Sequence, residues 1–235
     1  MPVIFKIQNK EYSYPQGWQD VTLEKWLKSL DIQKPEVLKT LYRLKTQKER
    51  EKHVVEKITP IVYSEKVLPY YMQYVNFWTG VSEAEMMSLK IGQLEQLYKQ
   101  IETNLNRSTE AATKDTSDTI QHAGRVYYLP TQHLKKGTVS EFIEAAQAEH
   151  LAKQLEGNQL KAIPKLLCIF LKTKKDAPYN PKQMEREGLF MSLTMDKVFK
   201  VSFFLLKLNE RFLQDSLIYT ALSHLSQHPH KLGQA

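Results

Sequence analysis

Residues 120–147 repeat the pattern of the N-terminus, and this repeat constrains the fold more than any other sequence feature. Near its start the chain reads FKIQNKEYSYP and, after a gap, VTLEKWL; in its middle it reads IQHAGRVYYLP and then GTVSEFI. Tyr12 matches Tyr127, and Pro15 matches Pro130. Each copy predicts a strand, a tight turn, a second strand, a loop and a capped helix. Because a lone hairpin is marginal in water, the two hairpins are expected to pair into one small sheet.

Turn and capping residues support both copies. Asn9-Lys10 is expected to turn the first hairpin, and Gly124-Arg125 occupies the matching position in the second. Thr22 is a good N-cap for the first helix, which carries Leu23, Trp26, Leu27 and Leu30, and Thr138 or Ser140 caps the second. The second helix carries Phe142, Ile143, Ala146, His150 and Leu151.

Outside the repeat, the apolar spacing is that of helices, including one from about Glu36 to Lys57 and a last one after Thr194. The predicted fold class is therefore α+β, predominantly α-helical, with two β-hairpin–helix units. We expect a single compact domain built from an N-terminal half (1–105), a polar loop (106–118) and a C-terminal half (119–235). Two consecutive lobes divided near residue 110 are the alternative.

Composition narrows the class of protein. A hydrophobic fraction of 42% can supply a core, and the single cysteine, Cys168, excludes an internal disulfide or a cysteine-based zinc cluster. The sequence has no run of about 18 apolar residues, so no membrane span is expected. It also contains none of the common nucleotide-binding, hydrolase or metalloenzyme motifs, so no cofactor, metal or catalytic residue is predicted.

The formal charge of +7 suggests contact with nucleic acid, an anionic surface or an acidic partner, or serves solubility alone. Two segments concentrate the positive charge. The segment from Lys45 to His53 is either a solvated helix face or exposed turn, or a phosphate-contacting strip, and the segment from Lys172 to Pro181 is a basic loop. The nucleic-acid candidates are Lys45, Lys48, Arg50, Lys52, Lys172, Lys174 and Lys175.

Two apolar features are the candidates for protein contacts. Aromatic residues cluster at helical spacing between Tyr70 and Trp78, which is more typical of a core than of a base-stacking platform. The last predicted helix is apolar on a wide face, as in a central helix or one covered by a partner. The candidate contact residues are Tyr71, Tyr74, Phe77, Trp78, Phe203, Phe204, Leu208 and Phe212.

Four pieces of the sequence, in this order, resemble structural and assembly proteins of tailed bacteriophages, particularly of crAss-like and related phages. The pieces are YPQGWQDVTLEKWL, GRVYYLP, IPKLLCIFLKTKKDAPYNP and MEREGLFMSLTMDKVFKVSFFL. The resemblance implies a virion or morphogenesis component, such as a connector or ring protein, a packaged protein or a tail-assembly chaperone. It supplies no site residues, because none of the four pieces is a catalytic signature.

The sequence therefore predicts a non-enzymatic phage structural or assembly protein, associated with the tail or portal, that acts through protein–protein contacts. Its expected partners are other virion or assembly proteins and further copies of itself, in the virion or the host cytoplasm and not in a membrane. A nucleic-acid-binding protein is the alternative from another class. An enzyme assembled from scattered residues is the third.

Overall fold

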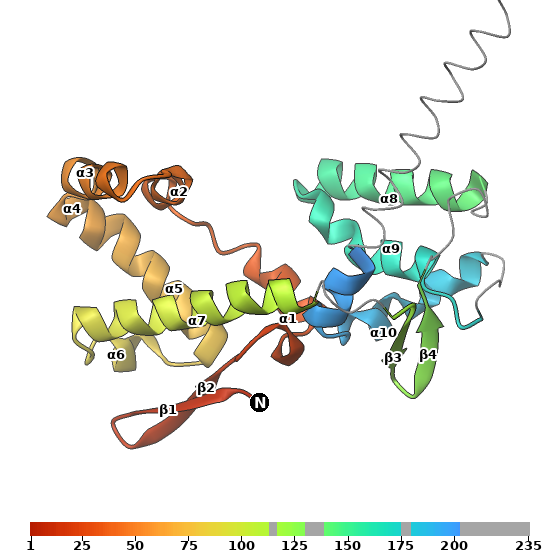
Figure 1. The fold of residues 1–235 in the computed structure, drawn as a ribbon, viewed down its shortest axis with the longest axis horizontal. Helices are drawn as coiled ribbons and strands as arrows, with labels where there is room; N and C mark the ends of the chain where they lie inside the picture. The colour runs from red at the N-terminus through yellow and green to blue at the C-terminus, as the bar shows by residue number, and fades with distance from the viewer. Residues whose placement is uncertain (113–116, 130–138, 175–179, 203–235) are drawn as a thin grey trace, which may run out of the picture. The chain divides into compact units, whose positions relative to one another are not determined.

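The computed structural model describes residues 1–112, 117–129, 139–174 and 180–202, which belong to two compact units (Figure 1). Unit 1 comprises Met1–Ala111 and Thr194–Asp196, and unit 2 comprises Ala112–Leu193 and the chain from Lys197 onward. Each unit is mostly helical and contains one antiparallel two-stranded sheet. The predicted class, α+β and predominantly α-helical, is confirmed.

Unit 1 starts with a hairpin and continues as helices. Its elements are β1 (Val3–Ile7), β2 (Lys10–Tyr14), the 3-10 helix η1 (Trp18–Asp20), α1 (Leu23–Ser29), α2 (Glu36–Arg43), α3 (Gln47–Lys57), α4 (Pro60–Val62), the π-helical segment η2 (Tyr63–Val67), α5 (Leu68–Thr79), α6 (Glu83–Met86) and α7 (Ile91–Ala112). The segment Thr194–Asp196 joins this unit, and the Met195 amide donates to the carbonyl of Val21 (2.8 Å).

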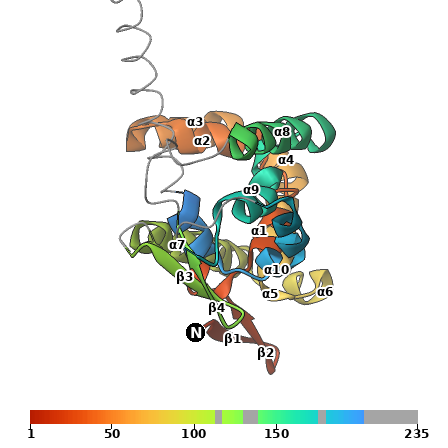
Figure 2. The same cartoon turned by 90° about the vertical axis from the view of Figure 1, so that its right-hand side faces the viewer.

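Unit 2 repeats the order of hairpin and helices. Its elements are β3 (Thr119–His122), β4 (Arg125–Tyr128), α8 (Val139–Glu156), the 3-10 helix η4 (Gln159–Ala162), α9 (Ile163–Phe170), the 3-10 helix η5 (Pro181–Arg186) and α10 (Glu187–Met191). Within this unit, α9 lies between α8 and α10 in both views (Figures 1 and 2). Residues 195–202 are helical directly after Thr194, which is where the last helix was predicted to begin.

The two hairpins have the same backbone geometry, as the repeat predicts. Ile7 pairs with Lys10 across the first turn as His122 pairs with Arg125 across the second. The turn residues have positive φ in both copies, 46° and 70° at Gln8 and Asn9, and 47° and 70° at Ala123 and Gly124. Two consecutive positive φ angles define a type I′ turn, which matches the twist of the strands. The first turn therefore lies one residue earlier than expected, at Gln8-Asn9, and Lys10 and Arg125 begin the return strands.

The hairpins do not pair with each other, so the expected single sheet is wrong. Each hairpin instead contacts helices of its own unit. The Tyr14 hydroxyl on β2 donates to Gln100 on α7 (3.4 Å), and the ring of Tyr127 on β4 lies 5.3 Å from that of Phe190 on α10. Helix packing thus supplies the support that an isolated two-stranded hairpin needs.

Two predicted helix boundaries are also corrected. The helix expected from Glu36 to Lys57 is interrupted, because Thr46 starts α3 with a capping box to Glu49 that ends the continuity with α2. The polar loop expected at residues 106–118 is helical as far as Ala112, since α7 continues beyond the buried Leu105. Extending an existing helix costs far less than starting one, so its polar end remains helical.

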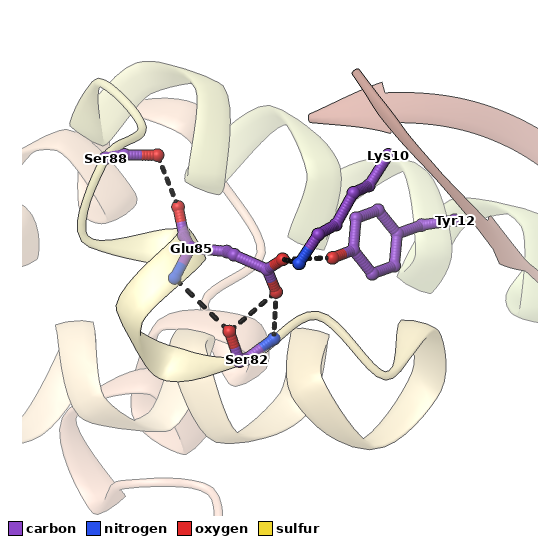
Figure 3. Close-up of polar contacts among 5 residues, drawn as sticks. All are labelled: Lys10, Tyr12, Ser82, Glu85 and Ser88. Carbon is purple, nitrogen blue, oxygen red and sulfur yellow. Dashed lines mark hydrogen bonds and ion pairs between the residues drawn. The ribbon is translucent and has the colours of Figure 1, made fainter. Parts of the chain in front are cut away.

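Glu85 on α6 holds the tip of the β1–β2 hairpin (Figure 3). One carboxylate oxygen accepts from the Lys10 ammonium (2.8 Å) and the Tyr12 hydroxyl (2.5 Å), while the other accepts from the Ser82 amide (3.0 Å). The hydrogen bond from Lys10, followed by those from Ser82 and Tyr12, holds the pKa of the Glu85 carboxyl well below its usual range. The capping box of α6 and the hairpin contact thus share one carboxylate.

This arrangement predicts a pH-dependent stability. The contribution of Glu85 is fully present above the unfolded glutamate pKa of about 4.3 and disappears as the pH falls through the lower folded-state value. Glu85→Gln is therefore expected to lower the melting temperature at neutral pH, with the gap to the wild type closing on acidification. Thermal melts at several pH values test this, with the exposed Glu83→Gln as the matched control. A gap that persists unchanged at low pH would contradict it.

Candidate functional site

The aromatic residues of α5 face α7 within unit 1. Tyr98 of α7 is 1% exposed, and its ring stacks on Tyr71 (4.3 Å between centroids) and meets Tyr70 and Tyr74 edge-on (5.8 and 5.0 Å). Trp78 is 3% exposed. We call Tyr70, Tyr71, Tyr74, Trp78 and Tyr98 the aromatic cluster. Its main role is to join α5 to α7.

Glu102 of α7 organises the polar edge of this cluster. Its carboxylate accepts from the hydroxyls of Tyr98 (2.9 Å) and Tyr42 (2.5 Å) and from the Lys34 ammonium (3.0 Å). The same ammonium lies 3.9 Å from the centre of the Tyr42 ring, so it also makes a cation–π contact. These contacts connect α2 and the chain before it to α7.

The phenols of the cluster remain protonated at physiological pH. Burial raises the pKa of Tyr70 and of Tyr71 to about 12, and it is also the main cause of the raised pKa of Tyr42, Tyr74 and Tyr98. A neutral phenol donates a hydrogen bond but is a poor nucleophile or base. The cluster is therefore suited to structural support.

The predicted partner-contact residues of α5 are only partly available to a partner. Trp78 belongs to the core, while Tyr71, Tyr74 and Phe77 are half-buried. The Lys25 ammonium on α1 lies near the rings of Phe77 and Trp78 (5.7 and 5.4 Å from their centres). Helix α1 therefore covers this end of α5. The other four candidates, Phe203, Phe204, Leu208 and Phe212, lie outside the described residues.

The basic candidates fall into two groups. Lys45, Lys48, Arg50 and Lys52 are all exposed, the last three on α3, although the Arg50 Nε donates to the Leu44 carbonyl (2.9 Å). In unit 2, Lys172 is half-buried and forms an ion pair with the buried Glu141 (2.7 Å). Its charge is therefore already matched. Lys174 is exposed, and Lys175 lies outside the described part of the chain.

Helix α8 exposes an apolar row. Ile143, Leu151 and Leu155 are 47%, 45% and 80% exposed, whereas Ala148 and Ala152 are 6% exposed and pack with Ala162 and Leu166. The small alanines of α8 let α9 approach closely, so the alanine face of the helix is buried and Ile143 and Leu151 stay largely exposed. The repeated Ala148-x-x-x-Ala152 spacing was the available signal.

The groups that most resemble reactive ones have structural partners. Burial raises the pKa of the Cys168 thiol to about 12, which disfavours a reactive thiolate. His122 Nε2 lies 3.2 Å from the Ser192 hydroxyl, but also 2.9 Å from the Leu189 carbonyl. A carbonyl only accepts, so Nε2 carries the proton there and cannot serve as a base for Ser192. Among the residues described, no group of three metal-ligating side chains is found.

No protein-family model, curated protein or solved structure matches the chain. No residue role is therefore transferred from a relative, and the site is argued from the contacts of this chain. None of the helices within the described ranges is long and apolar enough to cross a membrane. We call the three exposed apolar side chains on one face of α8, Ile143, Leu151 and Leu155, the α8 row.

Proposed function

We propose that the protein is a non-enzymatic structural or assembly component of a tailed phage, and that its copies associate through the α8 row. The observation that supports this association is the exposure of the row, with Leu155 at 80%. Burying an exposed leucine side chain stabilises a complex by about 1.5–3 kcal/mol, so a row of three offers a substantial driving force. The phage assignment itself rests on the sequence resemblance.

The spacing of the row favours a helix as the partner element. Ile143, Leu151 and Leu155 fall on one row of every fourth residue, in which Gln147 is the polar member. Rows with this spacing form the ridges of the commonest class of helix packing, in which the same kind of row is used on both helices. A second copy of α8 supplies such a row, and a symmetric pair buries the same patch on both subunits.

A matched pair of variants tests the self-association. Leu155→Glu is expected to convert the wild-type oligomer to a monomer in size-exclusion chromatography with light scattering, because it places a charge in the apolar contact. Val55→Glu is the control, since Val55 is 81% exposed and lies in unit 1. Neither side chain supports the core, so both variants should fold.

Three results would count against association of copies through α8. One is a wild type that remains monomeric across a micromolar concentration series. Another is an oligomer that Leu155→Glu leaves intact. The last is a monomer that starts to associate through α8 only after residues 203–235 are removed, which would identify the chain's own C-terminal segment as the natural cover. The phage role is tested separately, by mass spectrometry of purified particles and of complexes from infected cells.

The second candidate function is nucleic-acid binding, supported by the exposure of Lys45, Lys48 and Lys52. If these residues contact phosphates, replacing Lys48 and Lys52 by glutamine should weaken binding and flatten its salt dependence, by about one unit of slope for each lysine replaced. A gel-shift titration over a range of salt concentrations measures this. The nearby Glu49, Glu51 and Glu56 oppose the effect, and no shift at low salt would exclude this function.

A further inference from the structure

Unit 2 contains a cavity of about 410 Å³ whose lining includes two arginines. The lining residues are Arg125, Val126, Tyr128, Thr173 and Arg186. The volume lies in the range of small-molecule sites, about 300–1,000 Å³. Among the described residues, no carboxylate lines the cavity.

Separate parts of the chain bring these residues together. The type I′ turn at Ala123-Gly124 sets Arg125 at the start of β4. Tyr127 points to the core against Phe190, and because side chains alternate along a strand, Val126 and Tyr128 project from the opposite face. The Tyr128 amide donates to the Lys172 carbonyl (2.7 Å), which places Thr173 beside the strand. Arg186 is the last residue of η5.

The positive charge of this cavity is not neutralised from within. Neither Arg125 nor Arg186 forms an ion pair with another described residue, and Arg186 buries one Nη nitrogen that has no hydrogen-bond partner there. A buried donor without a partner costs about 1–3 kcal/mol, and more when the group is charged. By contrast, the neighbouring Lys172 is matched by Glu141. Within the described ranges, the guanidinium groups of Arg125 and Arg186 are therefore cations of the cavity lining that no carboxylate pairs with.

We propose that this cavity binds a single phosphate group, carried by a small phosphomonoester or as free phosphate. Guanidinium groups match the geometry of phosphate oxygens and bind them through paired, charge-assisted hydrogen bonds. Thr173 and Tyr128 each carry a hydroxyl that can donate to another oxygen. Two cations beside one open cavity suit one phosphate group, whereas a nucleic-acid strand requires a row of contacts.

Titration of the full chain with inorganic phosphate tests the proposal. We expect saturable binding at low ionic strength by calorimetry, together with shifts of arginine side-chain signals in NMR spectra. Arg125→Gln and Arg186→Gln should each weaken binding about tenfold or more, because each removes a charge-assisted hydrogen bond. Arg43→Gln, at an exposed arginine of α2 in unit 1, should leave the affinity unchanged.

The stability of the variants separates binding from folding. Arg125 is exposed at the hairpin, and Arg186→Gln removes a buried nitrogen that has no hydrogen-bond partner among the described residues, so both variants should melt no lower than the wild type. The proposal is overturned if phosphate does not bind saturably, or if Arg43→Gln weakens binding as much as Arg125→Gln. It is also overturned if a single-stranded oligonucleotide binds through these arginines and inorganic phosphate fails to displace it.

Discussion

Replacing Tyr98 by alanine is expected to lower the free energy of unfolding of unit 1 by about 3–5 kcal/mol, the usual cost of deleting a buried aromatic side chain. The Tyr98 side chain is 1% exposed, and its ring contacts three other tyrosines. Its deletion therefore leaves a cavity among these rings. Its removal also leaves the Glu102 carboxylate without one of its donors. Both effects loosen the contact between α5 and α7.

The tryptophans provide a local measurement of this effect. All three, Trp18, Trp26 and Trp78, lie in unit 1, so denaturant unfolding followed by tryptophan fluorescence reports on that unit. The exposed neighbour Lys99→Ala is the control and should change stability little. A fluorescence transition in Tyr98→Ala that coincides with that of Lys99→Ala would show that the cluster does not stabilise unit 1.

Tyr98→Phe separates the hydroxyl from the ring. It removes the hydrogen bond to Glu102 and the weaker contact with the Tyr42 hydroxyl (3.4 Å), and a hydrogen bond to a charged group contributes about 1.5–3 kcal/mol. We therefore expect a smaller loss than for alanine. If the phenylalanine variant is as stable as the wild type, then Tyr42 and Lys34 alone satisfy the carboxylate.

Local sequence patterns predicted the elements better than their packing. The two hairpins and the Thr22 cap depend on a few neighbouring residues, and each is present in the structure. Pairing of the hairpins into one sheet was inferred from the instability of a lone hairpin. Contacts such as Tyr14 with Gln100 remove that instability, and they join residues far apart in the sequence.

The errors within helices have a common physical origin. Low hydrophobicity placed residues 106–112 in a loop, and hydrophobicity alone did not indicate which face of α8 is buried. In α8, close packing instead buries Ala148 and Ala152, and in α7 a helix fixed by Ile101 and Leu105 extends through polar residues. Size and cooperativity outweighed hydrophobicity at both places.

The cavity lined by Arg125 and Arg186 could not be predicted from sequence, because Arg125, Thr173 and Arg186 share no local motif. The basic segment that sequence reasoning chose in this unit begins at Lys172, whose charge Glu141 matches. Net charge and runs of lysine indicate where cations are numerous, but not which of them lack a partner. That distinction depends on the fold.

Replacing Phe190 by alanine is expected to destabilise unit 2 by about 3–5 kcal/mol. Phe190 is fully buried, and its ring lies 5.3 Å from that of Tyr127 and 6.4 Å from that of His122. The variant should thus lose the packing that holds the β3–β4 hairpin on α10. Circular dichroism should show part of the helix signal melting earlier, while tryptophan fluorescence, which reports on unit 1, keeps its wild-type transition.

Tyr127→Phe is the informative partner of this variant. The Tyr127 hydroxyl is buried without a hydrogen-bond partner in the described part of the chain, so removing it should leave the stability of unit 2 unchanged or raise it. The exposed Lys182→Ala on η5 serves as the neutral reference. A large loss of stability in Tyr127→Phe would mean that the hydroxyl has a hydrogen-bond partner in the folded protein. An unchanged melt in Phe190→Ala would mean that the hairpin is held on unit 2 by other contacts.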